Sequence, residues 1–172
     1  MVNNDVLVDV YRNNQLEDVN INAYDGIILS PGPGLPCQAG KMPGIIQKYA
    51  KTKPFLGICL GHQGLGEYFG AKLLNLEFIH HGVSRETIHL GNSVLFKNLP
   101  TVFKSARYHS WGFKSAGFPS CLKVTSFDNA GIVMSFEHIE YPITGIQFHP
   151  ESILTDFGHE IIENWVNSIQ SN

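Results

Sequence analysis

A cysteine framed by glycines stands directly after an apolar run and before a stretch of helical character. The residues Gly57-Ile58-Cys59-Leu60-Gly61 form the pattern Gly-x-Cys-x-Gly. This pattern is the thiol counterpart of the Gly-x-Ser-x-Gly turn that exposes a nucleophile between a strand and a helix. A thiol at a helix N-terminus also feels partial positive charge and unpaired N–H groups, which favour its reactive thiolate form. The pattern therefore predicts that Cys59 is a catalytic nucleophile.

A histidine and a glutamate near the other end of the chain supply the partners that such a nucleophile needs. In His149-Pro150-Glu151, the proline pushes the residue before it toward an extended conformation. Residues two apart on an extended chain point the same way, so the Glu151 carboxylate can reach the ring of His149. The sequence thus predicts a Cys-His-Glu triad, in which Glu151 fixes the imidazole tautomer and the other ring nitrogen faces the sulfur.

A loop rich in proline and glycine, Ser30-Pro31-Gly32-Pro33-Gly34, follows a second apolar run. If this run and the one before Cys59 are parallel strands, both end at the same edge of a sheet. An N–H group of the loop, together with the N–H of Leu60, could then form an oxyanion hole. Each part alone has a simpler interpretation, as an inert buried thiol, a surface loop or a tight turn. Their joint occurrence favours catalysis.

Composition limits the classes of protein to which the chain can belong. With 172 residues, 43% hydrophobic and 16% charged, we expect one domain over residues 1–172 with a substantial core. A net charge of −3 with scattered charges offers no basic patch for nucleic acid. The cysteines, Cys37, Cys59 and Cys121, are too few and too far apart to predict a disulfide or a zinc site, and no cofactor is expected. Without a membrane-length apolar run or a secretory signal, we expect a cytoplasmic location and no membrane partner.

Apolar patterning predicts the elements that position these motifs. In the first half, strands are expected over 5–11, 25–30 and 54–58, and helices over 43–51 and 61–70. In the second half, short antiparallel strands are expected over 84–90, 93–96, 122–127 and 132–137, followed by a strand over 143–148 and a helix over 158–169. This order predicts an α/β fold with a mostly parallel central sheet, flanking helices and a smaller antiparallel sheet.

Four motifs together resemble, in order and spacing, the class I (triad) glutamine amidotransferases, most closely the glutaminase group of anthranilate synthase component II and aminodeoxychorismate synthase. The motifs are Ser30-Pro31-Gly32-Pro33-Gly34, Gly57-Ile58-Cys59-Leu60-Gly61-His62-Gln63, Arg107-Tyr108-His109-Ser110 and Phe148-His149-Pro150-Glu151-Ser152. The resemblance covers nearly the whole chain, although any one motif alone would be weak. It implies a flavodoxin-like fold of three layers.

The resemblance also implies a reaction, the hydrolysis of L-glutamine to glutamate and ammonia. In that reaction Cys59 attacks the side-chain amide, His149 protonates the departing ammonia, and Glu151 orients His149. The glycine loop would line the substrate site and supply oxyanion contact, Gln63 would touch the substrate, and Ser110 with Trp111 would hold its amino-acid end through backbone atoms. The implied substrate-binding residues are Gly32, Pro33, Gly34, Leu60, Gln63, Ser110 and Trp111.

Two departures from the family pattern accompany these expectations. Family members usually begin with a further strand and helix before the strand that resembles residues 5–12, so we expect an N-terminally truncated version of the fold. Neighbouring strands would then keep unpaired backbone groups. The second departure is Trp111, where relatives more often carry an aliphatic residue. Because the implied contact there is through backbone, the substrate class should be unaffected.

The resemblance implies a partner that receives the ammonia, a chorismate-using synthase subunit. The leading candidate is anthranilate synthase component I, in tryptophan biosynthesis, and the alternative is aminodeoxychorismate synthase component I, in folate biosynthesis. Two hypotheses of another kind stay open. The truncated chain could be a non-catalytic binding subunit, or it could be a stand-alone cysteine hydrolase acting on other γ-glutamyl amides.

Overall fold

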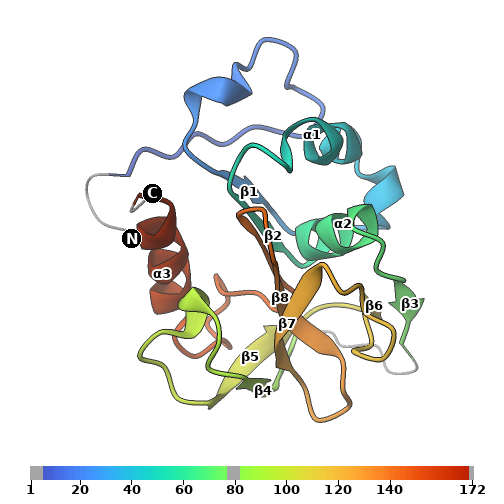
Figure 1. Ribbon diagram of the computed structural model, residues 1–172, viewed down its shortest axis with the longest axis vertical. Coiled ribbons are helices and arrows are strands. Elements are labelled where there is room, and N and C mark those ends of the chain that lie inside the picture. Colours follow the sequence, from blue (N-terminus) through green and yellow to red (C-terminus); the bar gives the residue numbers. More distant parts are fainter. Residues whose placement is uncertain (1–5, 77–81, 171–172) are drawn as a thin grey trace.

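The computed structural model describes residues 6–76 and 82–170, and within them the central element is a curled sheet of seven strands (Figure 1). Across this sheet the strands are β1 (Ile27–Leu29), β2 (Phe55–Ile58), β9 (Ile143–Ile146), β8 (Val133–His138), β7 (Leu122–Phe127), β4 (Val83–His89) and β5 (Val102–Arg107). The pairs β1–β2 and β2–β9 are parallel, and every later pair is antiparallel. A separate antiparallel pair joins β3 (Leu74–Asn75) to β6 (Trp111–Gly112).

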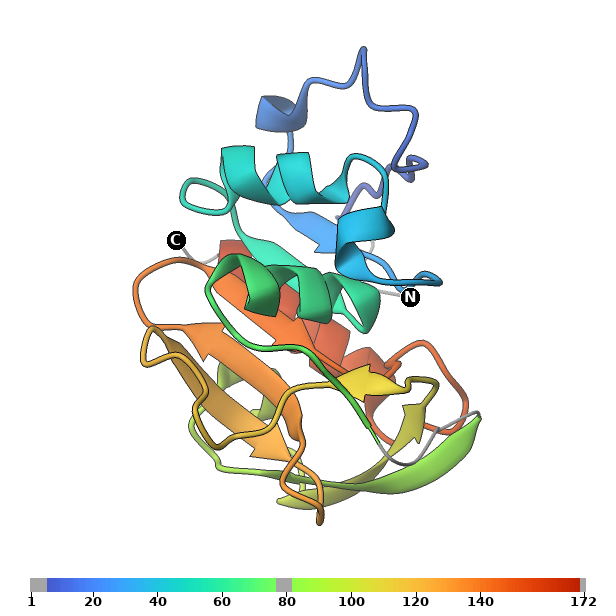
Figure 2. The same ribbon diagram turned by 90° about the vertical axis from the view of Figure 1, so that its right-hand side faces the viewer.

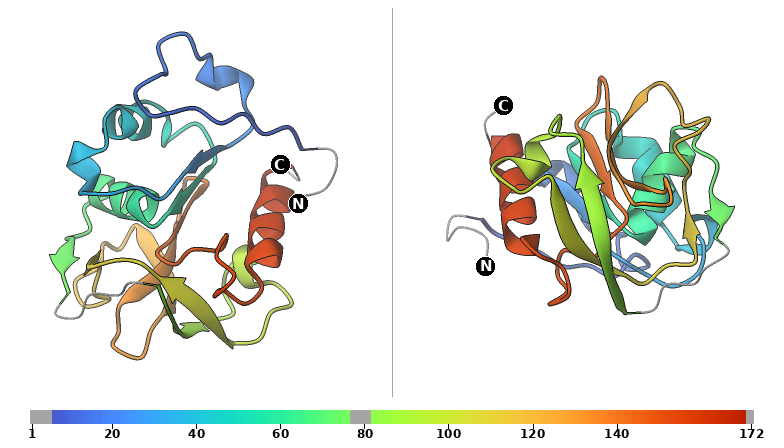
Figure 3. Two further views of the ribbon diagram at one scale, coloured as in Figure 1. Left: turned by 180° about the vertical axis from the view of Figure 1, so that it is seen from behind. Right: turned by 90° about the horizontal axis from the view of Figure 1, so that it is seen from below.

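Helices cover both faces of the parallel part of the sheet. Figure 2 shows α1 (Met42–Tyr49) and α2 (Leu60–Tyr68) on one face, and Figure 3 shows α3 (Gly158–Gln170) on the other. Short 3-10 turns lie at η1 (Ile21–Ala23), η2 (Pro36–Gln38) and η3 (Val94–Phe96). The predicted α/β class with flanking helices is therefore confirmed. The central sheet is mixed rather than mostly parallel, because four of its six strand pairs are antiparallel, and the strands expected in a smaller antiparallel sheet belong to it. In the part of the chain that the structure describes, no helix is long and apolar enough to cross a membrane.

Successive side chains of β2 supply two separate cores, because neighbours along a strand point to opposite faces of the sheet. Phe55 joins a cluster that includes Ile46 of α1 and Leu65 of α2. The next residue, Leu56, joins the cluster that includes Trp165 of α3. Each large apolar side chain buried in this way contributes roughly 1.5–3 kcal/mol. The two cores hold β2, and therefore the residue that follows it, between layers on both sides.

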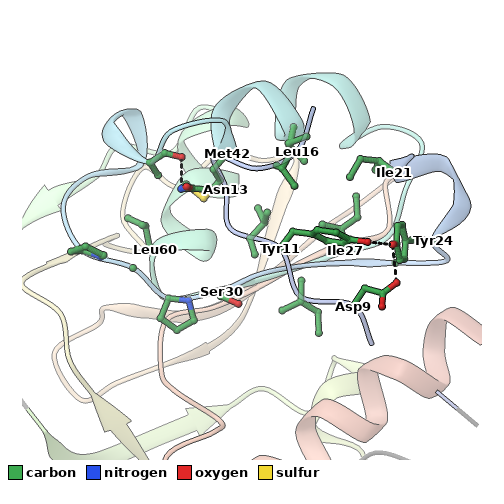
Figure 4. A pocket seen from close by; sticks show the side chains of 18 of the residues that line it. Asp9, Tyr11, Asn13, Leu16, Ile21, Tyr24, Ile27, Ser30, Met42 and Leu60 are labelled. Carbon is green, nitrogen blue, oxygen red and sulfur yellow. Dashed lines mark hydrogen bonds between the residues drawn. The ribbon is translucent and has the colours of Figure 1, made fainter. Parts of the chain in front are cut away.

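The strand expected over 5–11 is wrong within the described residues, since residues 6–11 form no strand; Asp5 lies outside them. Leu7 and Val10 are 96% and 89% exposed. The outer edge of β1 faces a pocket of about 550 Å³ instead of a paired strand (Figure 4). A strand needs a neighbour to satisfy its backbone N–H and C=O groups, so valine alternation alone does not produce one.

The strand expected over 93–96 is also wrong, because these residues form the η3 turn. The side chain of Ser93 accepts a hydrogen bond from the backbone N–H of Leu95 at 3.2 Å, a local cap that competes with extended structure. Leu95 and Phe96 are buried in the same cluster as Trp165 of α3. Their apolar character therefore reflects packing under a helix. The remaining expected strands and helices are confirmed, with ends that differ by at most two residues.

Candidate active site

Cys59 occupies the sharp turn between β2 and α2, where it caps the helix. Its backbone has φ 51° and ψ −100°, a left-handed conformation that costs a non-glycine residue about 1–3 kcal/mol. The two flanking glycines permit the turn. A Cβ on Gly61 would lie 2.3 Å from the carbonyl oxygen of Leu29, and one on Gly57 would lie 2.5 Å from the backbone of Gly61. The backbone N–H of Cys59 donates to Ile146 at 2.8 Å, which ties the turn to β9.

His149 and Glu151 follow β9 and form the predicted pair. The Nδ1 atom of His149 lies 2.7 Å from Oε1 of Glu151. The backbone around the histidine is fixed at both sides, since its N–H donates to Ala106 at 3.3 Å and its carbonyl accepts from the Thr155 hydroxyl at 2.5 Å. The Tyr108 ring packs edge-on against the imidazole at 4.8 Å. These contacts fix which ring nitrogen meets the carboxylate and leave Nε2 for another partner.

The protonation of His149 depends on both Cys59 and Glu151. Burial lowers the pKa of His149, but its interactions with Cys59 and Glu151 outweigh burial and raise the pKa to about 9. Burial raises the pKa of Glu151, and the hydrogen bond from His149 outweighs it and lowers that pKa. The buried Nε2 of His149 has no hydrogen bond of normal geometry within the described residues. Cys59 is nevertheless near enough to raise the pKa of the ring. At neutral pH the imidazole of His149 is therefore charged, and it interacts with both Glu151 and Cys59.

The glycine loop lies where the sequence predicts, beside the residue that follows the nucleophile. Leu29 at the end of β1 pairs in parallel with Gly57, so both strands end at one edge of the sheet. A Cβ on Gly32 would lie 2.9 Å from the side chain of Leu60, which brings loop and helix N-terminus into contact. Gly34 has φ 79°, a value that favours glycine. The loop at Gly32 and the side chain of Leu60 are therefore in close contact.

The remaining predicted residues meet beside the first turn of α2. Nε2 of Gln63 donates to the carbonyl of Trp111 at 3.1 Å and to Oε1 of Gln147 at 3.2 Å. The carbonyl of Ser110 accepts from the N–H of Leu76 at 2.7 Å, beside the β3–β6 pair. The structure thus brings the Ser110-Trp111 segment into contact with α2, the helix that begins at the nucleophile.

Gln147 is a residue near the sulfur that the sequence reasoning missed. Its Nε2 donates to Sγ of Cys59 at 3.6 Å. The signal was available, since Gln147 stands two residues before His149 on extended chain, and such residues share a face. The extended pattern before His149 therefore indicates that Gln147 faces the nucleophile.

His62, next to the nucleophile region on α2, belongs to the core. Its ring lies 5.3 Å from Phe113 and 4.8 Å from Phe136, and it is fully buried. Burial lowers the pKa of His62 to about 3, which keeps the ring neutral at physiological pH. In the described residues, no group of three or more His, Cys, Asp or Glu side chains could hold a metal ion.

The pocket in Figure 4 is a separate feature. Gly32, Pro33 and Leu60 line part of it, but Cys59, His149 and Glu151 do not. It lies between the extended chain near Tyr11, β1 and α1, so it is not the place of the thiol chemistry.

Comparison with known proteins shows the family to which the chain belongs. The family model for class I glutamine amidotransferases matches residues 1–169. An anthranilate synthase component 2 from Azospirillum brasilense is 42% identical over 94% of this chain and 83% of its own length. An aminodeoxychorismate synthase component 2 from Serratia marcescens is 37% identical over 93% of this chain and 86% of its own length.

Solved structures share the fold at low sequence identity. A glutamine amidotransferase from Thermotoga maritima superposes with a TM-score of 0.65 at 19% identity, over 90% of this chain and 66% of its own. A structure from Thermoplasma acidophilum superposes with a TM-score of 0.76 at 24% identity, over 93% and 77%. The family match, covering nearly all the sequence, decides the class: this chain belongs to the class I glutamine amidotransferases. It is a glutaminase-type enzyme.

Proposed function

We propose that the chain is the glutaminase subunit of a chorismate-using synthase and that Cys59, His149 and Glu151 carry out the hydrolysis. Relatives at 42% and 37% identity are named as components of two such synthases, which supports a subunit of this kind. The observation that supports the reaction best is the 2.7 Å contact between Nδ1 of His149 and the Glu151 carboxylate. The same imidazole interacts with Cys59, which is held in a strained turn.

The reaction proceeds through a thioester. The sulfur of Cys59 attacks the side-chain carbonyl carbon of L-glutamine, and the carbonyl oxygen becomes an oxyanion. The N–H of Leu60 and the loop at Gly32 would stabilise that oxyanion, a contribution typically of several kcal/mol. His149 gives its proton to the nitrogen that leaves as ammonia and then takes a proton from water. The hydroxide left from that water attacks the thioester, the C–S bond breaks, glutamate is released, and the sulfur leaves as the thiolate beside the recharged His149.

The amino-acid end of glutamine would bind at Ser110 and Trp111. The carbonyl oxygen of Trp111 already accepts from Gln63 and from Nδ1 of His109, at 3.1 and 2.9 Å. A carbonyl oxygen has two lone pairs, so this acceptor is saturated. Trp111 would therefore contact the substrate through its N–H, which suits a carboxylate group.

The partner that receives the ammonia would be anthranilate synthase component I, since relatives named anthranilate synthase component 2 reach 42% identity. The alternative is aminodeoxychorismate synthase component I, whose second components match at 36–37%. Copurification from the native organism decides between them: recovery with only the aminodeoxychorismate partner would reject the tryptophan route.

The reaction is tested in the complex with the synthase, by measuring glutamate release and product formation from glutamine or from an ammonium salt. Cys59→Ser should abolish glutamine-dependent synthesis and leave ammonia-dependent synthesis intact, because only the first needs the thiolate. Cys37→Ser, which changes an exposed thiol, is the matched control and should leave both intact. A wild-type complex without glutaminase activity would instead indicate a non-catalytic binding subunit. Full activity without any partner would indicate a stand-alone hydrolase.

A further inference from the structure

A chain of buried amides connects the backbone of Trp111 to the sulfur of Cys59. Gln63 donates from Nε2 to the Trp111 carbonyl at 3.1 Å and to Oε1 of Gln147 at 3.2 Å. Gln147 in turn donates from Nε2 to Sγ of Cys59 at 3.6 Å. The two glutamine residues are 4% and 0% exposed. Bulk water therefore does not reach these groups to replace the contacts, and breaking one hydrogen bond leaves a buried polar group unpaired.

The direction of the hydrogen bonds in this chain is fixed at its Trp111 end. A backbone carbonyl oxygen only accepts, so Gln63 must present its NH₂ group there. The second contact of that NH₂ must then meet the oxygen of Gln147, which turns the NH₂ of Gln147 toward Cys59. The sulfur consequently receives a donor. Hydrogen bonds to an ionised acceptor are stronger than those to a neutral one, so this donor favours the charged sulfur.

The position of Gln147 is fixed by the sheet as well as by its side chain. Its backbone N–H donates to Met134 of β8 at 2.9 Å, which continues the sheet pairing past the end of β9. His149 follows two residues later and also interacts with the thiol. Gln147 has no titratable group, so it contributes a hydrogen bond and a fixed geometry where His149 contributes a proton.

We propose that Gln147 is a positioning residue for the nucleophile: its amide holds the sulfur of Cys59 and stabilises the thiolate, and Gln63 couples this contact to the Trp111 segment. The coupling rests on the proposed function, because Trp111 matters to the reaction only if glutamine binds there. Any shift of the Trp111 carbonyl when glutamine binds is then transmitted through Gln63 and Gln147 to the sulfur. Substrate binding and thiol activation are linked by three hydrogen bonds.

The first test needs no glutamine and measures alkylation of Cys59 by iodoacetamide. Gln147→Met keeps a similar length and removes the donor, so the alkylation rate at neutral pH should fall about tenfold, the size expected for one hydrogen bond to a charged group. The pH profile of alkylation should move to higher pH. Gln147→Glu keeps the shape but turns a carboxylate toward the sulfur, and the displacement should be larger. Gln47→Met, an exposed residue on α1, is the matched control and should leave the profile unchanged.

The second test measures the coupling through steady-state kinetics of the synthase complex. Gln63→Met and Gln147→Met should each lower kcat/KM for glutamine by about tenfold. If both act through one chain, the double variant should lose little more than either single variant. Independent roles would instead multiply the two losses and overturn the coupling. Ammonia-dependent synthesis, which bypasses the thiol, should be unchanged in all three.

The two tests separate failure of this inference from failure of the proposed function. If the complex does not hydrolyse glutamine but alkylation is slowed in the Gln147 variants, the proposed function is wrong and the positioning role of Gln147 is supported. If the complex is active and both Gln147 variants alkylate and turn over as the wild type does, the inference is overturned. Gln147→Glu, which conserves side-chain shape, covers the case in which Gln147→Met does not fold.

Discussion

The charge on His149 determines the pH range of the proposed reaction. Burial lowers the pKa of His149, and Cys59 and Glu151 together raise it to about 9, above its ordinary value of 6.5. The ring is therefore protonated at neutral pH and can give a proton to departing ammonia. We expect kcat/KM for glutamine to fall as the pH rises through about 9, which a pH–rate profile of the complex measures. A profile that is flat from pH 7 to pH 10 would contradict this role.

Replacement of the two residues should separate proton transfer from orientation. His149→Ala removes the general acid and should lower the glutaminase rate by roughly 10²–10⁴-fold. Glu151→Gln keeps the histidine but removes a charge that raises its pKa, so the loss should be smaller and the basic limb should move to lower pH. Equal losses would show that Glu151 does more than orient and charge the ring, and a basic limb that does not move would show that Glu151 does not raise the pKa of His149.

Single residues differ in how far the sequence alone reveals them. Cys59 is predictable because the glycines on both sides of it mark a tight turn, in which a Cβ at either position would clash with neighbouring backbone. His149 and Glu151 are predictable because the proline between them fixes their relation. Gln147 is marked only by its place two residues before His149, and Arg107 is not marked at all, since its role depends on contacts with distant chain. Arg107, only 1% exposed, donates to the Glu86 carbonyl and the Thr87 hydroxyl at 2.9 Å, and its sequence neighbours give no sign of this.

At the scale of elements, the start of α3 packs directly against the loop that carries His149 and Glu151. A Cβ on Gly158, the first residue of α3, would lie 1.9 Å from the carbonyl oxygen of Pro150. Gly158→Ala should therefore displace the loop that holds His149 and Glu151. A displacement of about 1 Å can cost on the order of a hundredfold in rate. We expect a loss of that order in glutaminase activity and a lower thermal midpoint.

The matched control for this change is Gly44→Ala in α1. A Cβ there meets nothing within 4 Å, and its backbone lies in the ordinary helical range. Because alanine stabilises a helix interior by roughly 0.5–1 kcal/mol relative to glycine, this variant should keep full activity and gain slightly in thermal midpoint. A Gly158→Ala variant that behaves like Gly44→Ala would show that α3 does not support the triad.

An element is predictable from the sequence where burial alone determines its apolar pattern. Its prediction fails where pairing with a neighbouring strand determines whether it forms. β2 and β9 are short apolar runs buried on both faces, so the sequence marks them clearly. β5 was not predicted, because it buries polar side chains such as Ser105, whose hydroxyl pairs with Thr87 at 2.8 Å. Residues 6–11 carry a strand-like alternation but no paired neighbour. Pairing and buried polar contacts are long-range properties that a local pattern does not contain.

At the scale of the whole molecule, His62 makes stability depend on pH. Burial lowers the pKa of His62 to about 3, whereas the unfolded chain has the ordinary value of 6.5. Below about pH 6.5 the unfolded state binds a proton that the folded state does not, so stability is lost progressively as the pH falls toward about 3. His149 has the opposite shift, and its contribution is already fully present below 6.5, so it does not mask this loss.

Urea unfolding of the whole domain at about pH 7 and about pH 5 measures this dependence. The wild type should unfold at a lower urea concentration at the more acidic pH. His62→Phe replaces the ring with one that cannot titrate, among Phe113 and Phe136, and should flatten the difference whatever its effect on absolute stability. His159→Phe, on the opposite side of the sheet in α3, tests whether any lost histidine does the same. An unchanged pH difference in His62→Phe would mean that another group controls the acid stability of the fold.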